Sequence, residues 1–146
     1  MTRSWARPAI FGAFDGITCC LGVILSLLHE PRLILTAAAG VAAAEMVGMA
    51  AGEWQSKSDN GLAASVVVGA TSGFGAVLPA IPYAIVPAAA ARWCSVLVLL
   101  AVTAAIAFLR SDTRGRSRAF AESFGILAVV AAVVYLVQLL TPGGAT

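Results

Sequence analysis

Charged side chains are scarce in this sequence. Only 11% of its 146 residues are Asp, Glu, Lys or Arg, whereas 60% are hydrophobic. A soluble globule of this length needs more polar surface than these residues can supply. The charges also fall in clusters, so that long stretches between them carry none. The scarcity of charge therefore excludes a soluble domain and predicts a protein that lies in a membrane.

The residue sets of common enzymes are missing as well. The chain has a single histidine, His29, and it contains no P-loop, no paired-histidine motif and no Ser/His/Asp set. We therefore predict that the protein is not an enzyme and holds no cofactor. A cleaved signal peptide is not expected either. The segment after Arg3 and Arg7 contains Asp15, and no small-residue cleavage pattern follows it.

Five apolar stretches remain between the charged clusters. A helix that crosses the hydrocarbon core needs about 20 mostly apolar residues. The stretches that qualify are 10–28, 33–52, 61–86, 93–109 and 120–140. They are apolar on all sides, unlike the alternating strands of a membrane β-barrel. The predicted fold is all-α, a single transmembrane domain over residues 1–146 with five membrane-spanning helices.

The basic residues of the loops predict the orientation, because cytoplasmic loops are enriched in Lys and Arg. If the N-terminus is cytoplasmic, Arg32 and Arg92 are the only basic residues on the outer side of the membrane. The basic residues on the cytoplasmic side are then Arg3, Arg7, Lys57, Arg110, Arg114, Arg116 and Arg118. This explains the basic run at 110–118, so we expect no nucleic-acid partner despite the net charge of +2. The excess of Arg over Lys is associated with bacterial genomes, and we expect a bacterial cytoplasmic membrane.

Two carboxylates fall well inside predicted spans, Asp15 in the first and Glu45 in the second. An ionisable side chain in the middle of a spanning helix costs roughly 2.5–3.5 kcal/mol, which makes it a functional candidate. The hairpin turns near Glu30 and Pro31, so antiparallel helices place both carboxylates roughly 10 Å below the cytoplasmic surface. The alternative is two unrelated carboxyl groups, each protonated or hydrogen-bonded to a neighbouring helix.

The second span carries a polar face. Glu45, Met49 and Glu53 are spaced by four residues and so lie on one side of a helix. Carboxylates suit Mn, and a thioether adds affinity for softer ions. With Asp15, these residues predict a site for Fe(II), Mn(II), Co(II) or Zn(II). Removal from water favours a protonated carboxyl group and a divalent cation favours the carboxylate, so the cation would exchange with protons.

Two pairs of glycines have the spacing that lets helix backbones approach closely in a membrane. Gly12 and Gly16 lie in the first span, and Gly48 and Gly52 lie in the second. Each pair would therefore let another backbone come close.

Three segments resemble motifs of the vacuolar iron transporter family, which includes yeast iron/manganese vacuolar carriers and plant nodulin-like relatives. The segment 11–17 (FGAFDGI) is similar to the Asp-Gly motif of the family's first helix. The segment 49–56 (MAAGEWQS) resembles its second-helix motif, Met-Ala-x-Gly-Glu-Tyr-x-Ser. The segment 75–83 (GAVLPAIPY) is similar to its third-helix Gly-Ala-x-x-Pro-x-x-Pro-Tyr motif. The resemblance covers residues 10–86.

The resemblance implies a homodimer of five-helix protomers with a cation path between them, lined by Asp15 and Met49. It also implies that Fe(II) or Mn(II) leaves the cytoplasm in exchange for protons. The expected partners are thus a divalent metal ion, protons, the lipid bilayer and a second copy of the chain.

Two departures from the family pattern leave alternatives open. The family's transporters carry a cytoplasmic, Glu-rich metal-binding domain between the second and third helices, and only residues 54–60 fill that gap here. The chain is thus a short form, and one alternative is a non-transporting membrane module that stabilises a partner. Cys19 and Cys20 replace small residues after the Asp-Gly motif. They either pack as small apolar side chains or add thiolate ligands, which would favour Zn(II), Co(II) or Ni(II).

Overall fold

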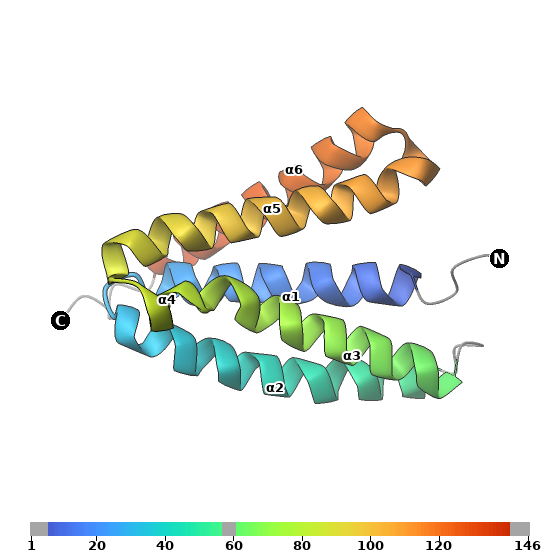
Figure 1. The fold of residues 1–146 in the computed structure, drawn as a ribbon, viewed down its shortest axis with the longest axis horizontal. Helices are drawn as coiled ribbons and strands as arrows, with labels where there is room; N and C mark the ends of the chain where they lie inside the picture. The colour runs from blue at the N-terminus through green and yellow to red at the C-terminus, as the bar shows by residue number, and fades with distance from the viewer. Residues whose placement is uncertain (1–5, 57–60, 141–146) are drawn as a thin grey trace.

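The computed structural model describes residues 6–56 and 61–140, with the backbone alone at 111–114. Its helices are α1 (Ala6–Ser26), α2 (Pro31–Gln55), α3 (Gly61–Val77), α4 (Pro82–Ile85), α5 (Ala88–Arg114) and α6 (Arg116–Leu140), and a 3-10 turn, η1 (Leu78–Ala80), follows α3 (Figure 1). Within the described ranges, five helices are long and apolar enough to cross a membrane, the third being α3 together with η1. The predicted all-α class with five spans is confirmed.

The helix bounds differ from the predicted spans in the third span and, by a few residues, at most helix ends. The third span ends at Ala80 rather than at residue 86, and the short α4 follows it. Pro79 and Pro82 explain this break, because proline has no N–H for the helical hydrogen bond of its turn. The helices α5 and α6 begin four to five residues before the apolar stretches that predicted them. Hydropathy marks the part of a helix in hydrocarbon, and the helix itself continues into polar residues.

The long helices place the basic residues at two opposite ends. The start of α1, the end of α2, the start of α3 and the turn between α5 and α6 lie at one end of the molecule (Figure 1). Among the described residues, that end holds Arg7, Arg110, Arg116 and Arg118, and the opposite end holds Arg32 and Arg92. The predicted orientation requires this separation.

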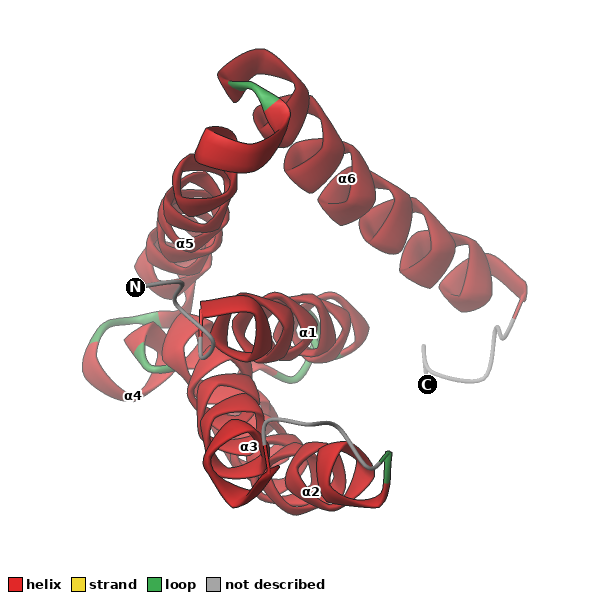
Figure 2. Ribbon diagram, turned by 90° about the vertical axis from the view of Figure 1, so that its right-hand side faces the viewer, coloured by secondary structure: helices red, strands yellow, loops and turns green. Residues whose placement is uncertain are grey.

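Both α1 and α2 pack against α3, and they touch each other much less (Figure 2). Glycines allow this approach. A Cβ atom on Gly16 of α1 would overlap the carbonyl oxygen of Ser72, and one on Gly75 of α3 would lie 2.7 Å from the carbonyl oxygen of Ala13. On the other side of α3, a Cβ atom on Gly69 would overlap a backbone carbonyl of α2. These three helices therefore meet backbone to backbone.

The two predicted glycine pairs behave differently. Gly12 and Gly16 are buried against α3, which confirms the expectation for the first span. A Cβ atom on Gly48 or Gly52 would find no described atom of another residue within 4 Å. Within the described residues of the single chain, no backbone packs against this second pair, because α3 approaches α2 on a different face.

Side chains of α5 and α6 reach the end of α1. Arg92 Nη2 donates a hydrogen bond to the carbonyl oxygen of Leu28 at 2.9 Å, and Gln138 Nε2 donates one to that of Leu25 at 2.6 Å. Leu25 lies in the last turn of α1, whose carbonyls have no partner within the helix, so Gln138 satisfies a group that would otherwise be exposed to lipid. Leu28 lies in the turn that follows α1. The two contacts attach α5 and α6 to α1.

Replacing Gln138 with leucine is expected to lower the free energy of unfolding by about 0.5–1.5 kcal/mol, because the Leu25 carbonyl loses its donor. Denaturant titration in detergent micelles measures this difference. Leu139→Ala is the control, since that neighbouring side chain is 61% exposed and its truncation should cost less than about 0.5 kcal/mol. Equal losses in both variants would contradict the role assigned to the hydrogen bond.

Candidate metal site

One face of α1 and one face of α2 lie opposite each other, and α3 packs against both helices. On each helix, the residues concerned are spaced by four and therefore lie on one side. They are Phe11, Asp15 and Cys19 on α1, and Glu53, Met49 and Glu45 on α2. Val68 and Ser72 of α3, also spaced by four, lie beneath the two sets.

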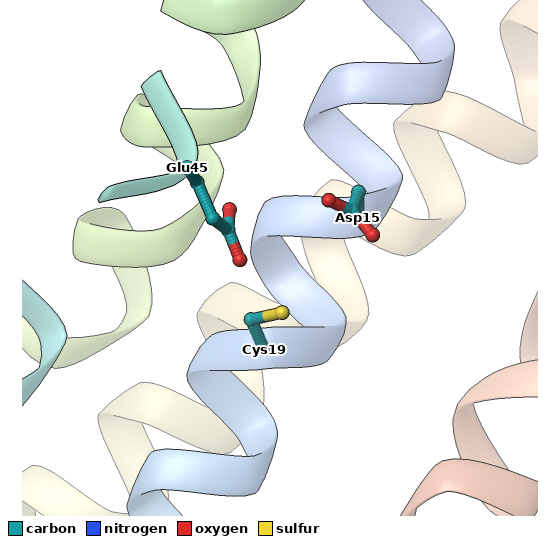
Figure 3. A group of neighbouring side chains, drawn as sticks. All are labelled: Asp15, Cys19 and Glu45. Atoms are coloured by element: carbon teal, nitrogen blue, oxygen red, sulfur yellow. The ribbon is translucent and has the colours of Figure 1, made fainter. Parts of the chain in front are cut away.

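Three of these side chains come together. Asp15, Cys19 and Glu45 each offer a ligand atom, and the three atoms lie within 4.8 Å of one another (Figure 3). All three residues are half-buried. Figure 3 shows Glu45 reaching from α2 toward α1, where Asp15 and Cys19 lie one turn apart. The predicted meeting of Asp15 and Glu45 at one depth is thus confirmed.

A serine of α3 holds the carboxylate of Glu45. Ser72 is fully buried, and its Oγ donates a hydrogen bond to Glu45 Oε2 at 2.6 Å. The other oxygen, Oε1, is buried and accepts no well-formed hydrogen bond from the residues that the structure describes. The Cys19 thiol and Asp15 lie close enough to interact with this carboxylate. One oxygen of Glu45 is therefore fixed in place and the other is left without a strong partner.

No basic side chain neutralises this cluster in the described part of the chain. The ion pairs found there join Glu122 to Arg110 at 3.2 Å and to Arg118 at 2.9 Å, near the turn between α5 and α6. Two carboxylates within hydrocarbon require a proton, a cation or a hydrogen-bond donor each. Ser72 supplies one donor, so protons or a divalent cation remain to neutralise the cluster.

A pocket lies next to the cluster, toward the end of the molecule where α1 begins and α2 ends. Its volume is about 220 Å³, and its lining residues are Phe11, Gly48, Met49, Gly52, Glu53 and Val68. Met49 lies one turn and Glu53 two turns from Glu45 on α2, which corresponds to about 6 and 12 Å along the helix. The four predicted ligands are thus divided between two places: Asp15 and Glu45 lie in the cluster, and Met49 and Glu53 line the pocket.

Ser72 was not among the predicted site residues, and the sequence left Cys19 open between a thiolate ligand and a packing residue. Cys19 follows Asp15 by four residues, and this helical spacing would have placed both side chains on one face. Ser72 gave no such signal, because its contact with Glu45 depends on how α2 packs on α3. The hydroxyl of Thr18 is not part of the site, since it donates to the carbonyl oxygen of Asp15.

Comparison with known proteins identifies the family of this segment. Residues 6–62 match the model of the VIT family. The matched segment contains α1 and α2 and all four predicted ligands. No curated protein and no solved structure matches the chain. Residues 6–62, which hold the first two helices, are therefore similar to the VIT family, and the resemblance to vacuolar iron transporters is confirmed over these residues.

Proposed function

We propose that this protein exports Fe(II) or Mn(II) from the cytoplasm in exchange for protons. The VIT family match supports a membrane metal transporter, and the five apolar helices support an integral membrane protein. The observation that carries the proposal is the pair of carboxylates, Asp15 and Glu45, which face each other within the membrane with no basic side chain paired to either in the described residues.

The exchange follows from the charge of this cluster. Without a cation, two carboxyl groups in hydrocarbon are neutral only when they hold protons. A divalent cation between them replaces those protons and coordinates the same oxygens. The pocket supplies a route from the cytoplasm, since Met49 and Glu53 line it one and two turns away. A cation would first meet Glu53, then the Met49 thioether, and then Asp15 and Glu45.

We propose further that the protein works as a homodimer with the cation path between protomers. Five helices are few to enclose a path, and Asp15 and Glu45 are only half-buried in the single chain. Gly48 and Gly52 beside the pocket have no described side chain or backbone of another residue within 4 Å of a Cβ position. Small residues on an open helix face permit a second helix to come close.

One feature favours the alternative, a non-transporting membrane module. The chain has only residues 56–60 between the end of α2 and the start of α3. The family resemblance implies a cytoplasmic metal-binding domain at that place. If metal capture by such a domain is needed for transport, this chain would keep the membrane helices for another purpose.

Uptake into liposomes tests the proposal. The purified protein is reconstituted into vesicles with an acidic lumen, and Fe(II) or Mn(II) is added outside. We expect uptake that grows with the pH difference, together with a rise of the luminal pH, because each cation that enters displaces protons. An ionophore that dissipates the pH difference should stop the uptake, and protein-free vesicles give the background.

Each other outcome has a definite meaning. Uptake that ignores the pH difference would contradict proton exchange and leave metal transport standing. Uptake no greater than in protein-free vesicles, with both ions and at every pH difference, would contradict transport and favour the membrane module.

A further inference from the structure

We infer that the Cys19 thiolate is a third ligand of the transported cation, and that it makes the site select thiophilic divalent ions over Mn(II). The inference rests on the proposed function and narrows its substrate class. Among the ions considered above, it favours Fe(II), Co(II) and Zn(II), because thiolate sulfur suits these better than it suits Mn(II).

The spacing of the ligand atoms carries this inference. In a tetrahedral site, metal–sulfur and metal–oxygen bonds of about 2.3 and 2.1 Å place the ligand atoms roughly 3.6 Å apart. The Cys19 sulfur and one oxygen each of Asp15 and Glu45 lie within 4.8 Å of one another. The largest closure needed is about 1.2 Å, the difference between 4.8 Å and roughly 3.6 Å, which small rotations of the three side chains supply.

The unpartnered oxygen of Glu45 gives independent support. Oε1 is buried and lacks a well-formed hydrogen bond from the described residues, although Ser72 satisfies Oε2. A buried carboxylate oxygen without a donor is costly unless a proton or a cation binds it. The cluster therefore holds a buried acceptor on α2 opposite a thiol and a carboxylate that share one face of α1 (Figure 3).

The two adjacent cysteines, Cys19 and Cys20, have different surroundings, and only those of Cys19 suit a metal ligand. Cys20 is fully buried and belongs to the hydrophobic core with Ile17 and Ile24, whereas Cys19 is half-buried and faces Glu45. The two thiols differ by one position on α1 and so by about 100° around the helix axis. When Cys19 binds the cation, its thiol proton is released and its sulfur donates the electron pair of the new bond.

Cobalt(II) is the probe, because a thiolate bound to Co(II) gives a sulfur-to-metal charge-transfer absorption band. The full chain in detergent micelles is titrated with Co(II) and separately with Mn(II). We expect the band in the wild type and in Cys20→Ser, and its loss in Cys19→Ser. The Cys19→Ser variant should bind Co(II) at least about tenfold more weakly, while its affinity for Mn(II) changes less than about threefold.

The results separate this inference from the proposed function. Co(II) binding without the band in the wild type, or a band that survives in Cys19→Ser, would overturn the thiolate and leave the carboxylate site intact. A band that depends on Cys19 in a protein without liposome uptake would sustain the ligand and overturn the transport. Absence of Co(II) binding to a wild type that binds Mn(II) would overturn the thiolate ligand alone, and absence of binding of both ions would overturn both proposals.

Discussion

Glu45→Gln is expected to reduce cation uptake into acid-loaded liposomes by about 100-fold or more, since even residues that only position a metal ligand are worth 10–100-fold. The amide keeps the shape of the side chain and can still accept the hydrogen bond of Ser72. It removes the charge that attracts the cation and the proton that is exchanged. Asp15→Asn should have the same effect, because it removes the second charge of the cluster. Initial rates of uptake measure both losses.

The matched control is Glu30→Gln, the same chemical change at an exposed residue between α1 and α2. This variant should transport at the wild-type rate, and all variants should elute alike on size-exclusion chromatography. For Glu53→Gln we expect an uptake rate between those of Glu45→Gln and Glu30→Gln, because Glu53 lines the pocket two turns from the cluster. Wild-type uptake by both Asp15→Asn and Glu45→Gln would show that the cation does not pass between them.

Gly16→Ala is expected to destabilise the protein by about 3 kcal/mol or more, at the upper end of the usual cost of overpacking. A Cβ atom at this position would overlap the carbonyl oxygen of Ser72 and would lie 2.7 Å from the backbone nitrogen of Ala76. Backbone atoms of a helix cannot rotate away as a side chain can, so α1 and α3 would have to separate. The loss of apparent melting temperature in detergent micelles measures the effect.

Gly40→Ala is the control for this second prediction. A Cβ atom on Gly40 meets nothing within 4 Å among the described residues, so the substitution adds no overlap. It should leave stability unchanged or raise it by up to about 1 kcal/mol, because alanine favours the helix more than glycine does. A Gly16→Ala protein as stable as the Gly40→Ala protein would mean that α1 and α3 do not touch as described.

Counting residues from a turn was enough to find the centre of the site. Asp15 and Glu45 are nearly equidistant from the hairpin at Glu30 and Pro31, and antiparallel helices with a common rise must bring them to one depth. The same arithmetic separates Glu53 from them by about 12 Å along α2, so its shared helix face did not make it part of the cluster. A shared helix face shows only that side chains point the same way, and their positions along the helix axis decide which of them come into contact.

The sequence alone could not predict that α3 contributes Ser72 to the site. Ser72 is one of several small residues in a helix without charges, and its periodicity does not tell which side meets α2. Glycines on two sides of this helix indicate close packing, yet they do not assign a partner to each side. The pairing of α3 with both α1 and α2 arises from the whole bundle, and the donor to Glu45 follows from that pairing.

The backbone contacts of α3 also limit how the protein can open to either side of the membrane. With glycine carbonyl contacts on both sides of α3, the helices α1, α2 and α3 cannot tilt apart without losing their closest packing. Asp15, Cys19 and Glu45 would then travel together on one stiff unit. In the proposed transport cycle, alternating access would therefore arise from rigid-body movement of this three-helix unit against α6 or against a second protomer.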